Sequence, residues 1–414
     1  MNAYTDTQFP VDSSSILFLA QIRKNHTNVY RFSMTLSEEV SPEILQAAVD
    51  RIYKRFPSVI AYFRPNFFHY TQIPVTQPPQ VQPDPGCLIT MPIEDIHRCA
   101  YRVYYKGNTV AIEAFHALTD GFGAIASFTT LIAEYLRMKY DIQVPASETV
   151  RNLEDAPADF ELADAYIDHQ AGKPLMIPAR YAYQIPHNAD TDWSVKTTAH
   201  VYPTDEILAA SRKHGVSATT LLSTVMASSV MEFQQKHTPN SKKPVRIMVP
   251  VDLRRIFNSG TLRNFVLYAL PTMESHENKL PLEERLKNFH TQIRSQLDRN
   301  RLASIMAYNV RAQHSWFMRY LPRVLKYAAL RIGNRFFGET TSSVTVTNLG
   351  NLRLPAEMQP YVEDIQVILT PRIRSPYGCA VISYNNKLAI NISTFRNDSE
   401  LDDIFRRNME FAMK

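Results

Sequence analysis

The sequence is short of cysteine. Its 414 residues contain three, Cys87, Cys99 and Cys379, and none of them stands in a C-x-x-C frame. An odd number of cysteines cannot pair completely, so the pattern argues against a disulfide framework and against a zinc ribbon. We therefore expect a protein of the reducing cytoplasm, with no metal site.

Long apolar runs and a secretory pattern are also missing. No window of about 18 uninterrupted apolar residues occurs, and the N-terminal stretch MNAYTDTQFPVDSSS has neither a basic start nor an apolar core. Hydrophobic residues still make up 45% of the chain and charged residues 21%, so it can bury enough surface to fold. We expect a fully folded, soluble protein with no transmembrane segment and no visible export signal.

Neither sign of charge dominates the chain as a whole. Lys and Arg number 45 against 40 Asp and Glu, a formal net charge of +5, and there is no long basic block. Nucleic acid is therefore not an expected partner, whereas a local basic patch for an anionic ligand stays open. Three widespread enzyme motifs are absent too: G-x-S-x-G, G-x-x-x-x-G-K-[ST] and H-E-x-x-H.

The length predicts two domains or one large pseudo-symmetric unit, with a crevice between its halves. Strand and helix patterns recur in both halves without a repeat of fixed period, and a stretch rich in proline and acidic residues, about 141–198, separates them. We interpret that stretch as the crossover. The predicted division places an N-terminal lobe at residues 1–180 and a C-terminal lobe at residues 181–414.

One short stretch combines residues that can do chemistry. FHALTDGFG contains His116, Asp120 and Gly121 in the frame His-x-x-x-Asp-Gly, directly after the alternating run TVAIEAF. Alternation in a strand puts His116 on the same face as three apolar residues, Val110, Ile112 and Ala114. An apolar setting opposes protonation and lowers a histidine pKa, so the ring would keep a neutral nitrogen available as a general base.

The two residues that complete the motif have structural interpretations. Asp120 could cap the following helix, or pair with a buried arginine and so hold the turn that aims the imidazole. Gly121 would let the backbone turn tightly. The plain alternative is a hydrogen-bonded core histidine beside an N-cap aspartate, and this stretch alone does not decide between the two.

Further stretches carry a resemblance to a known family. VPVDLRRIFNSGTLRNFVLYALP, Val249 to Pro271, contains a Val-Asp-x-Arg frame and then Asn-Phe before a strand. With the histidine motif, it resembles the acyltransferase superfamily of chloramphenicol acetyltransferase, the plant BAHD enzymes and nonribosomal peptide condensation domains. LQAAVDRIYKRFP, SSVTVTNLG and SYNNKLAINIS are most similar to the alcohol acetyltransferase branch. The resemblance spans nearly the whole chain, and only the histidine motif is sharply specific.

The sequence departs from the family in two places. The fuller motif has two histidines, and Phe115 stands at the first; strand alternation points it away from His116, so we expect activity to survive. The DFGWG motif of the plant enzymes is absent, and the nearest stretch, TPRIRSPYGC, does not match it. The chain thus falls outside the plant group, and acceptor recognition stays unassigned.

The resemblance implies an α/β (α+β) fold of two chloramphenicol-acetyltransferase-like lobes, with mixed sheets flanked by helices and an active-site tunnel at their interface. It implies that His116 is the general base, and that Asp120 is structural, paired with an arginine of the second lobe. Arg254 matches the motif position and Arg255 is the runner-up, although a solvated strand end would also explain both. Asn348 and Gly350 either line the tunnel or form an ordinary turn.

The implied reaction moves an acyl group from an acyl-CoA, acetyl-CoA foremost, to the hydroxyl of a small or lipid-like alcohol. No bound cofactor and no covalent acyl-enzyme are needed. Two alternatives stay open: amide or ester formation from the thioester of an acyl carrier protein, and a non-catalytic binding member of the same fold.

A helix predicted over residues 322–336 bears on the substrate. Its apolar stripe is flanked by cations, as in a helix that lies on a membrane surface. A core helix with cations at its edges would look the same, and we favour it because two stripe residues are only alanines. The stripe consists of Val324, Leu325, Ala328, Ala329 and Ile332.

Overall fold

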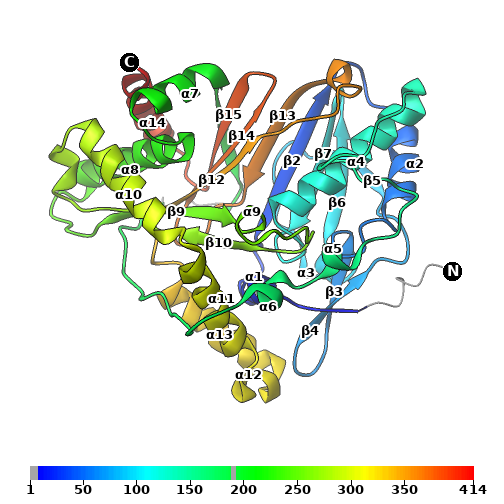
Figure 1. Ribbon diagram of the computed structural model, residues 1–414, viewed down its shortest axis with the longest axis horizontal. Coiled ribbons are helices and arrows are strands. Elements are labelled where there is room, and N and C mark those ends of the chain that lie inside the picture. The colour runs from blue at the N-terminus through cyan, green and yellow to red at the C-terminus, as the bar shows by residue number, and fades with distance from the viewer. Residues whose placement is uncertain (1–7, 188–192) are drawn as a thin grey trace.

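The computed structural model describes residues 8–187 and 193–414, and its elements gather in two groups that lie side by side (Figure 1). The first seven residues, part of the stretch in which no export signal is expected, lie outside the described ranges. Three sheets form the framework, and both parallel and antiparallel pairs occur.

The first group is built on a five-stranded sheet with the order β13-β2-β7-β6-β5. Its strands are β2 Val29–Leu36, β5 Val81–Pro83, β6 Tyr101–Lys106, β7 Thr109–Phe115 and β13 Val362–Leu369. The long helices α2, Pro42–Ile52, and α4, Gly121–Tyr140, pack against each other beside it. Shorter helices complete this half: α1 Ser13–Ala20, α3 Ile93–Ile96, α5 Asp159–Leu162 and α6 Ala165–His169.

The second group is built on a seven-stranded sheet with the order β10-β9-β12-β14-β15-β8, to which β11 adds by pairing with β9. Its strands are β8 Lys196–Pro203, β9 Val245–Asp252, β10 Val266–Ala269, β11 Thr272–Met273, β12 Val344–Asn351, β14 Tyr377–Tyr384 and β15 Lys387–Thr394. Its helices are α7 Thr204–Lys213, α8 Ala218–His237, α9 Arg254–Phe257, α10 Leu282–Gln296, α11 Arg299–Gln313, α12 Trp316–Tyr320, α13 Arg323–Phe337 and α14 Glu400–Met413.

Local sequence explains where the predicted helices begin. The side chain of Ser41 accepts a hydrogen bond from the backbone of Ile44, with Pro42 at the first helical position of α2. Ser217 does the same for Thr220 at the start of α8. Because α8 is apolar or small nearly all round, it is buried between α14, α10 and β9 and forms the centre of the second core.

The two groups share a strand. β13 comes from the C-terminal half of the chain, yet it pairs antiparallel with β2 along Val362 to Leu369 and so extends the sheet of the first group. The division at residue 180 remains a prediction, and β13 crosses it. Because β13 connects the second half to the sheet of the first, strands and helices of both halves border the space between them.

Three elements that the sequence analysis did not identify contribute to the architecture. Helix α1 begins at an N-cap, Asp12, whose carboxylate accepts from Ser15. The hairpin of β3, Ala61–Pro65, and β4, Tyr70–Pro74, forms a three-stranded sheet with β1, Phe9–Pro10. Strand β5, which ends at Pro83, pairs parallel to β6 at the sheet edge, where a strand tolerates proline.

Helix α13 overturns the interpretation favoured from its sequence. All five residues of its apolar stripe are exposed, Val324 by 70% and Ile332 by 61%. The buried face carries Lys326 and Tyr327 instead, and Tyr327 packs edge-on against Tyr70 of β4. The core-helix interpretation was wrong because a stripe of modest area can stay in solvent while the polar side finds backbone partners.

Within the described residues, no single helix has both the length and the apolar character to cross a membrane, and one bent pair, α7 with α8, passes by length and composition only.

The two halves approach each other closely at the start of α4. A Cβ atom on Gly123 would overlap the backbone carbonyl of Leu262, from the segment after α9, and the hydroxyl of Thr119. Thr119 Oγ1 itself donates to that carbonyl, with 2.5 Å between the oxygens. Only glycine leaves room for this contact.

We predict that Gly123→Ala lowers the free energy of unfolding by about 1 to 3 kcal/mol, because a backbone carbonyl cannot rotate aside as a side chain would. Gly333→Ala in α13 is the control, since a Cβ there meets nothing within 4 Å. Alanine in that open helical position should leave stability unchanged or raise it by about 0.5 to 1 kcal/mol. Urea unfolding measures both variants, and equal losses would contradict the assigned contact.

Candidate active site

The histidine motif occupies the turn between β7 and α4. The strand ends at Phe115, one residue before the alternation predicts, and the backbone N–H of His116 donates to the carbonyl of Asn28 across 2.8 Å. The ring of Phe115 packs edge-on against Phe63 in the core, whereas that of His116 stacks on Phe18. The two side chains thus take different directions, as the sequence predicted.

Two aromatic rings surround the imidazole of His116. Phe18 of α1 lies parallel to it with centroids 4.3 Å apart, and Tyr30 of β2 meets it edge-on at 4.9 Å. Burial in this apolar setting lowers the pKa of His116, while its own backbone, the charge of Asp120 and the side chain of Asn264 act in the opposite direction. Burial prevails, so the ring favours its neutral form.

The carboxylate of Asp120 is a buried junction between the two halves. One oxygen accepts from the backbone of Phe122 at 3.1 Å and so caps α4. The other accepts from the backbone of Phe265 at 2.8 Å and lies 2.9 Å from Nη2 of Arg254. Both interpretations given for this aspartate therefore hold together: it is an N-cap and the partner of a buried arginine.

Arg254 completes the junction from the second half. Its side chain is 4% exposed and also donates to the carbonyl oxygens of Thr261 and Arg263 and to Asp252 at 2.9 Å. The solvated-strand-end interpretation fails for this residue. The runner-up, Arg255, is exposed and lines the cavity described below.

Asn264 is a positioning residue that sequence reasoning did not assign. Its amide nitrogen lies 3.2 Å from the carbonyl oxygen of His116 and 3.3 Å from that of Ala117. Ser15 of α1 also donates to Ala117, at 2.6 Å. The turn that carries the histidine is thus held from both halves. The sequence does carry a signal for it, the Asn-Phe pair before β10.

Gly121 and the residues of β12 take somewhat different parts from those expected. Gly121 is the first residue of α4 and its φ is not positive, so the turn does not need glycine for its angles; a Cβ there would press on the side chain of Leu349. Asn348 accepts from the backbone of Gly350, which has a φ of +75°, and donates to Thr219. Both residues line the cavity and form a turn as well.

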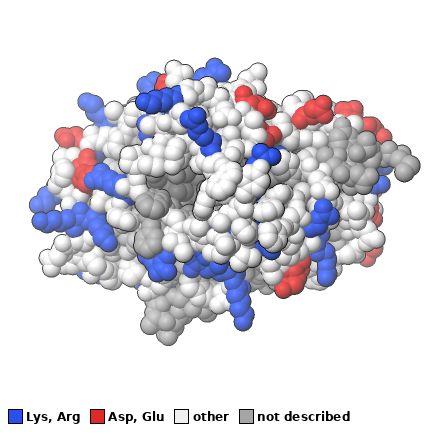
Figure 2. All heavy atoms as spheres, turned by 90° about the horizontal axis from the view of Figure 1, so that it is seen from below, with Lys and Arg blue, Asp and Glu red and all other residues white. Residues whose placement is uncertain are grey.

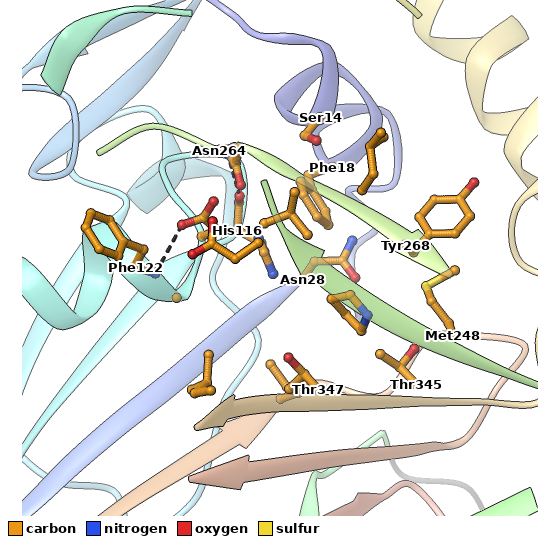
Figure 3. A pocket seen from close by; sticks show the side chains of 18 of the residues that line it. Ser14, Phe18, Asn28, His116, Phe122, Met248, Asn264, Tyr268, Thr345 and Thr347 are labelled. Atoms are coloured by element: carbon orange, nitrogen blue, oxygen red, sulfur yellow. Dashed lines mark hydrogen bonds between the residues drawn. The ribbon is translucent and has the colours of Figure 1, made fainter. Parts of the chain in front are cut away.

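A cavity of about 1570 Å³ opens beside the histidine. Figure 3 shows how side chains from separate elements face it, with Ser14 and Phe18 on α1, Met248 and Tyr268 on neighbouring strands, and Thr345 on β12. His116, Asp120 and Arg254 lie in its wall together with Asn348 and Gly350. The structure therefore brings every predicted site residue to one hollow between the halves, while a tunnel with two openings stays a prediction.

This arrangement defines a class of fold: two α/β lobes joined by an exchanged strand, with a histidine-bearing turn at their junction. Solved structures with a similar fold include acyltransferases and peptide-synthetase domains. The fold is thus the chloramphenicol-acetyltransferase-like, condensation-domain fold that the sequence predicted. The sequence itself matches no protein-family model and no curated protein.

Three of these structures illustrate the range of proteins that have a similar fold. TRI101 of Fusarium sporotrichioides, complexed with coenzyme A and T-2, is 13% identical, with a TM-score of 0.61 over 98% of each chain. The trichothecene 15-O-acetyltransferase TRI3 of the same fungus is 12% identical, with a TM-score of 0.60 over 98% of this chain and 94% of its own. The epimerization domain of tyrocidine synthetase B is 11% identical, with a TM-score of 0.58 over 98% and 97%.

We predict that Asp120→Asn lowers the free energy of unfolding by about 3 to 5 kcal/mol. The amide keeps one acceptor oxygen for only one of the two backbone donors, and it leaves the buried Arg254 without its enclosed counter-charge. Asp252→Asn is the matched control, since Asp252 contacts the same guanidinium with its side chain 44% exposed. Its cost should stay below about 1 kcal/mol. Equal losses in urea unfolding would contradict the assignment.

Proposed function

We propose that this protein is an acyltransferase that moves an acyl group from an acyl-CoA thioester to the hydroxyl of an alcohol. The single observation that supports this most is the neutral His116, set in the wall of a cavity whose other walls come from both halves of the molecule. A base in that position can reach two substrates that meet in the cavity.

The reaction needs one base and no covalent acyl-enzyme. The ring nitrogen of His116 takes the proton of the acceptor hydroxyl as the oxygen bonds to the thioester carbonyl carbon. The carbon–sulfur bond then breaks, and the departing sulfur receives that proton as a free thiol. The histidine is returned neutral, so atoms and charges balance over the cycle.

Positioned base catalysis contributes about 10²- to 10⁴-fold, so binding both substrates in line must supply the rest of the acceleration. The junction around Asp120 contributes to this alignment by fixing the position of the base, not by contacting substrate. It fixes the start of α4, and Asn264 fixes the carbonyl beside the ring, so the nitrogen stays in one place while the cavity fills.

Solved structures with this fold support the proposal by analogy of architecture. Among them are a 15-O-acetyltransferase, a wax ester synthase/diacylglycerol acyltransferase, and TRI101 complexed with coenzyme A and T-2. Peptide-synthetase domains share the fold too, which keeps the carrier-protein donor as the second candidate. Assaying the same acceptors with acyl-CoA and with an acylated carrier protein decides between the donors. Acetyl as the acyl group and the cytoplasm as the location remain predictions from the sequence.

We predict that His116→Ala lowers kcat/KM by about 10²- to 10⁴-fold, measured as acceptor-dependent release of free thiol from acetyl-CoA across a panel of alcohols. His214→Ala serves as the control: this histidine follows α7 and is not among the residues that line the cavity, so its loss should leave the rate unchanged. Undiminished thiol release by His116→Ala would overturn the assignment of the base.

We also predict the position of the acidic limb of the pH profile. The base must be neutral, and burial lowers the pKa of His116, so neutral base persists to lower pH than for an exposed histidine, whose pKa is about 6.5. The limb in kcat/KM should therefore have its midpoint below about pH 6.5. Replacing Phe18 with Asn would admit water to the ring and should shift the midpoint upward; a midpoint above that of free histidine contradicts the site.

A further inference from the structure

One face of the molecule combines exposed apolar side chains with a single sign of charge. Trp316, Phe317 and Tyr320 of α12 are exposed, Trp316 by 76%, and the exposed stripe of α13 with Val324 continues from them. In Figure 1 these helices project at the lower end of the molecule, away from both large sheets. Exposed apolar side chains grouped in this way mark a site of interaction.

The tip of the β3–β4 hairpin belongs to the same face. Phe67 at the tip is 71% exposed and meets Phe68 edge-on. Its carbonyl accepts from the backbone of Arg323 at 2.8 Å, and the carbonyl of Phe68 accepts from Lys326 at 2.7 Å. The hairpin tip and the start of α13 are thus joined, although about 250 residues separate them. We call this surface, formed by α12, the exposed stripe of α13 and Phe67, the α12–α13 face.

Its charge is one-sided. Between Asp298 and Glu339 the sequence contains eight Lys or Arg residues and no Asp or Glu. Arg319 and Arg335 are exposed. Figure 2, which views the molecule from this end, shows Lys and Arg side chains, and fewer Asp and Glu, around broad areas that carry no charge. Aromatic, aliphatic and arginine side chains in this combination suit a boundary between water and anionic lipid headgroups.

The face also adjoins the cavity. Leu17 of α1, Met318 of α12 and Leu330 of α13 line the cavity, and Leu17 is itself 43% exposed. Arg331 of α13 donates to the carbonyl oxygens of Ala20 and Ile22, which fixes α13 against the end of α1. A surface on which α12 and α13 rest would therefore lie at the edge of the cavity.

We propose that the α12–α13 face docks on an anionic lipid bilayer, with its aromatic and aliphatic side chains in the headgroup region and its arginines on lipid phosphates. The balance of charge decides the occupant. Arg319, Arg331 and Arg335 are exposed on α12 and α13, which carry no Asp or Glu, and each basic residue near an anionic surface contributes to binding. An uncharged bilayer would gain little from them. This inference does not depend on the acyl-transfer chemistry.

Flotation of the full chain with phosphatidylcholine vesicles, with and without phosphatidylglycerol, tests the proposal. We expect binding to the anionic vesicles only, and weaker binding as salt rises. The double variant Arg319→Gln, Arg335→Gln should lose about 25-fold in affinity, or about fivefold for each charge. Trp316→Ser with Val324→Ser should lose about tenfold or more.

Phe411→Ser is the matched control, because Phe411 is 65% exposed on α14 at the opposite end of the molecule, and it should bind vesicles as the native chain does. A second readout uses the two tryptophans of the sequence: with Trp193→Phe, Trp316 alone reports, and its emission should move to shorter wavelength on anionic vesicles. Each variant is checked for native circular dichroism and for thiol release with soluble acceptors.

Two results would overturn the proposal. One is a native chain that does not float with anionic vesicles, or whose flotation survives both double variants. The other is a dimer in solution that Trp316→Ser with Val324→Ser dissociates while no vesicle binding occurs, since the face would then cover a second copy. Because flotation requires no turnover, failure of docking leaves the proposed transfer reaction untouched, and failure of His116 leaves docking untouched.

Discussion

The contact between Asp120 and Arg254 is the constraint on which the site depends. A carboxylate from the first half and a guanidinium from the second are both nearly fully buried, with 2.9 Å between them. Removing two charges from water is costly, and the attraction compensates only when the remaining hydrogen-bonding positions are filled. Here they are filled by backbone groups of Phe122, Phe265 and Thr261, so the pair holds the halves in one relation.

The same junction explains how the charged carboxylate of Asp120 and the neutral imidazole of His116 can lie four residues apart. The charge of Asp120 acts to raise the pKa of His116, but this carboxylate is paired with Arg254. The rings of Phe18 and Tyr30 pack on the imidazole and reduce its contact with water. Desolvation therefore decides the direction of the shift. A structural ion pair and the proposed catalytic base can lie this close together because the charge of Asp120 is balanced by that of Arg254.

Helix α13 shows that an apolar stripe in the sequence does not by itself determine which face of a helix packs against the rest of the protein. Its cationic residues, and not its apolar stripe, hold it to the rest of the chain. Lys326, which is buried, and Arg323 donate to carbonyl oxygens on the β3–β4 hairpin, and Arg331 donates to one at the end of α1. Long cationic side chains can bury their apolar stems while their ends reach backbone acceptors. The apolar stripe is then left free to meet something other than this chain.

Sequence by itself determined the strand-to-helix turn with His116, the capping role open to Asp120, the starts of α2 and α8, and a mixed α/β architecture, because these follow from alternation, caps and spacing over a few residues. Only the tertiary structure decided that Arg254 rather than Arg255 meets Asp120, that Phe18 and Asn264 fix the histidine turn, that β13 joins the first sheet, and that the stripe of α13 faces solvent. Each of these depends on contacts, or on the lack of contacts, between segments far apart in the chain. A pattern over a few residues does not specify which distant segments meet.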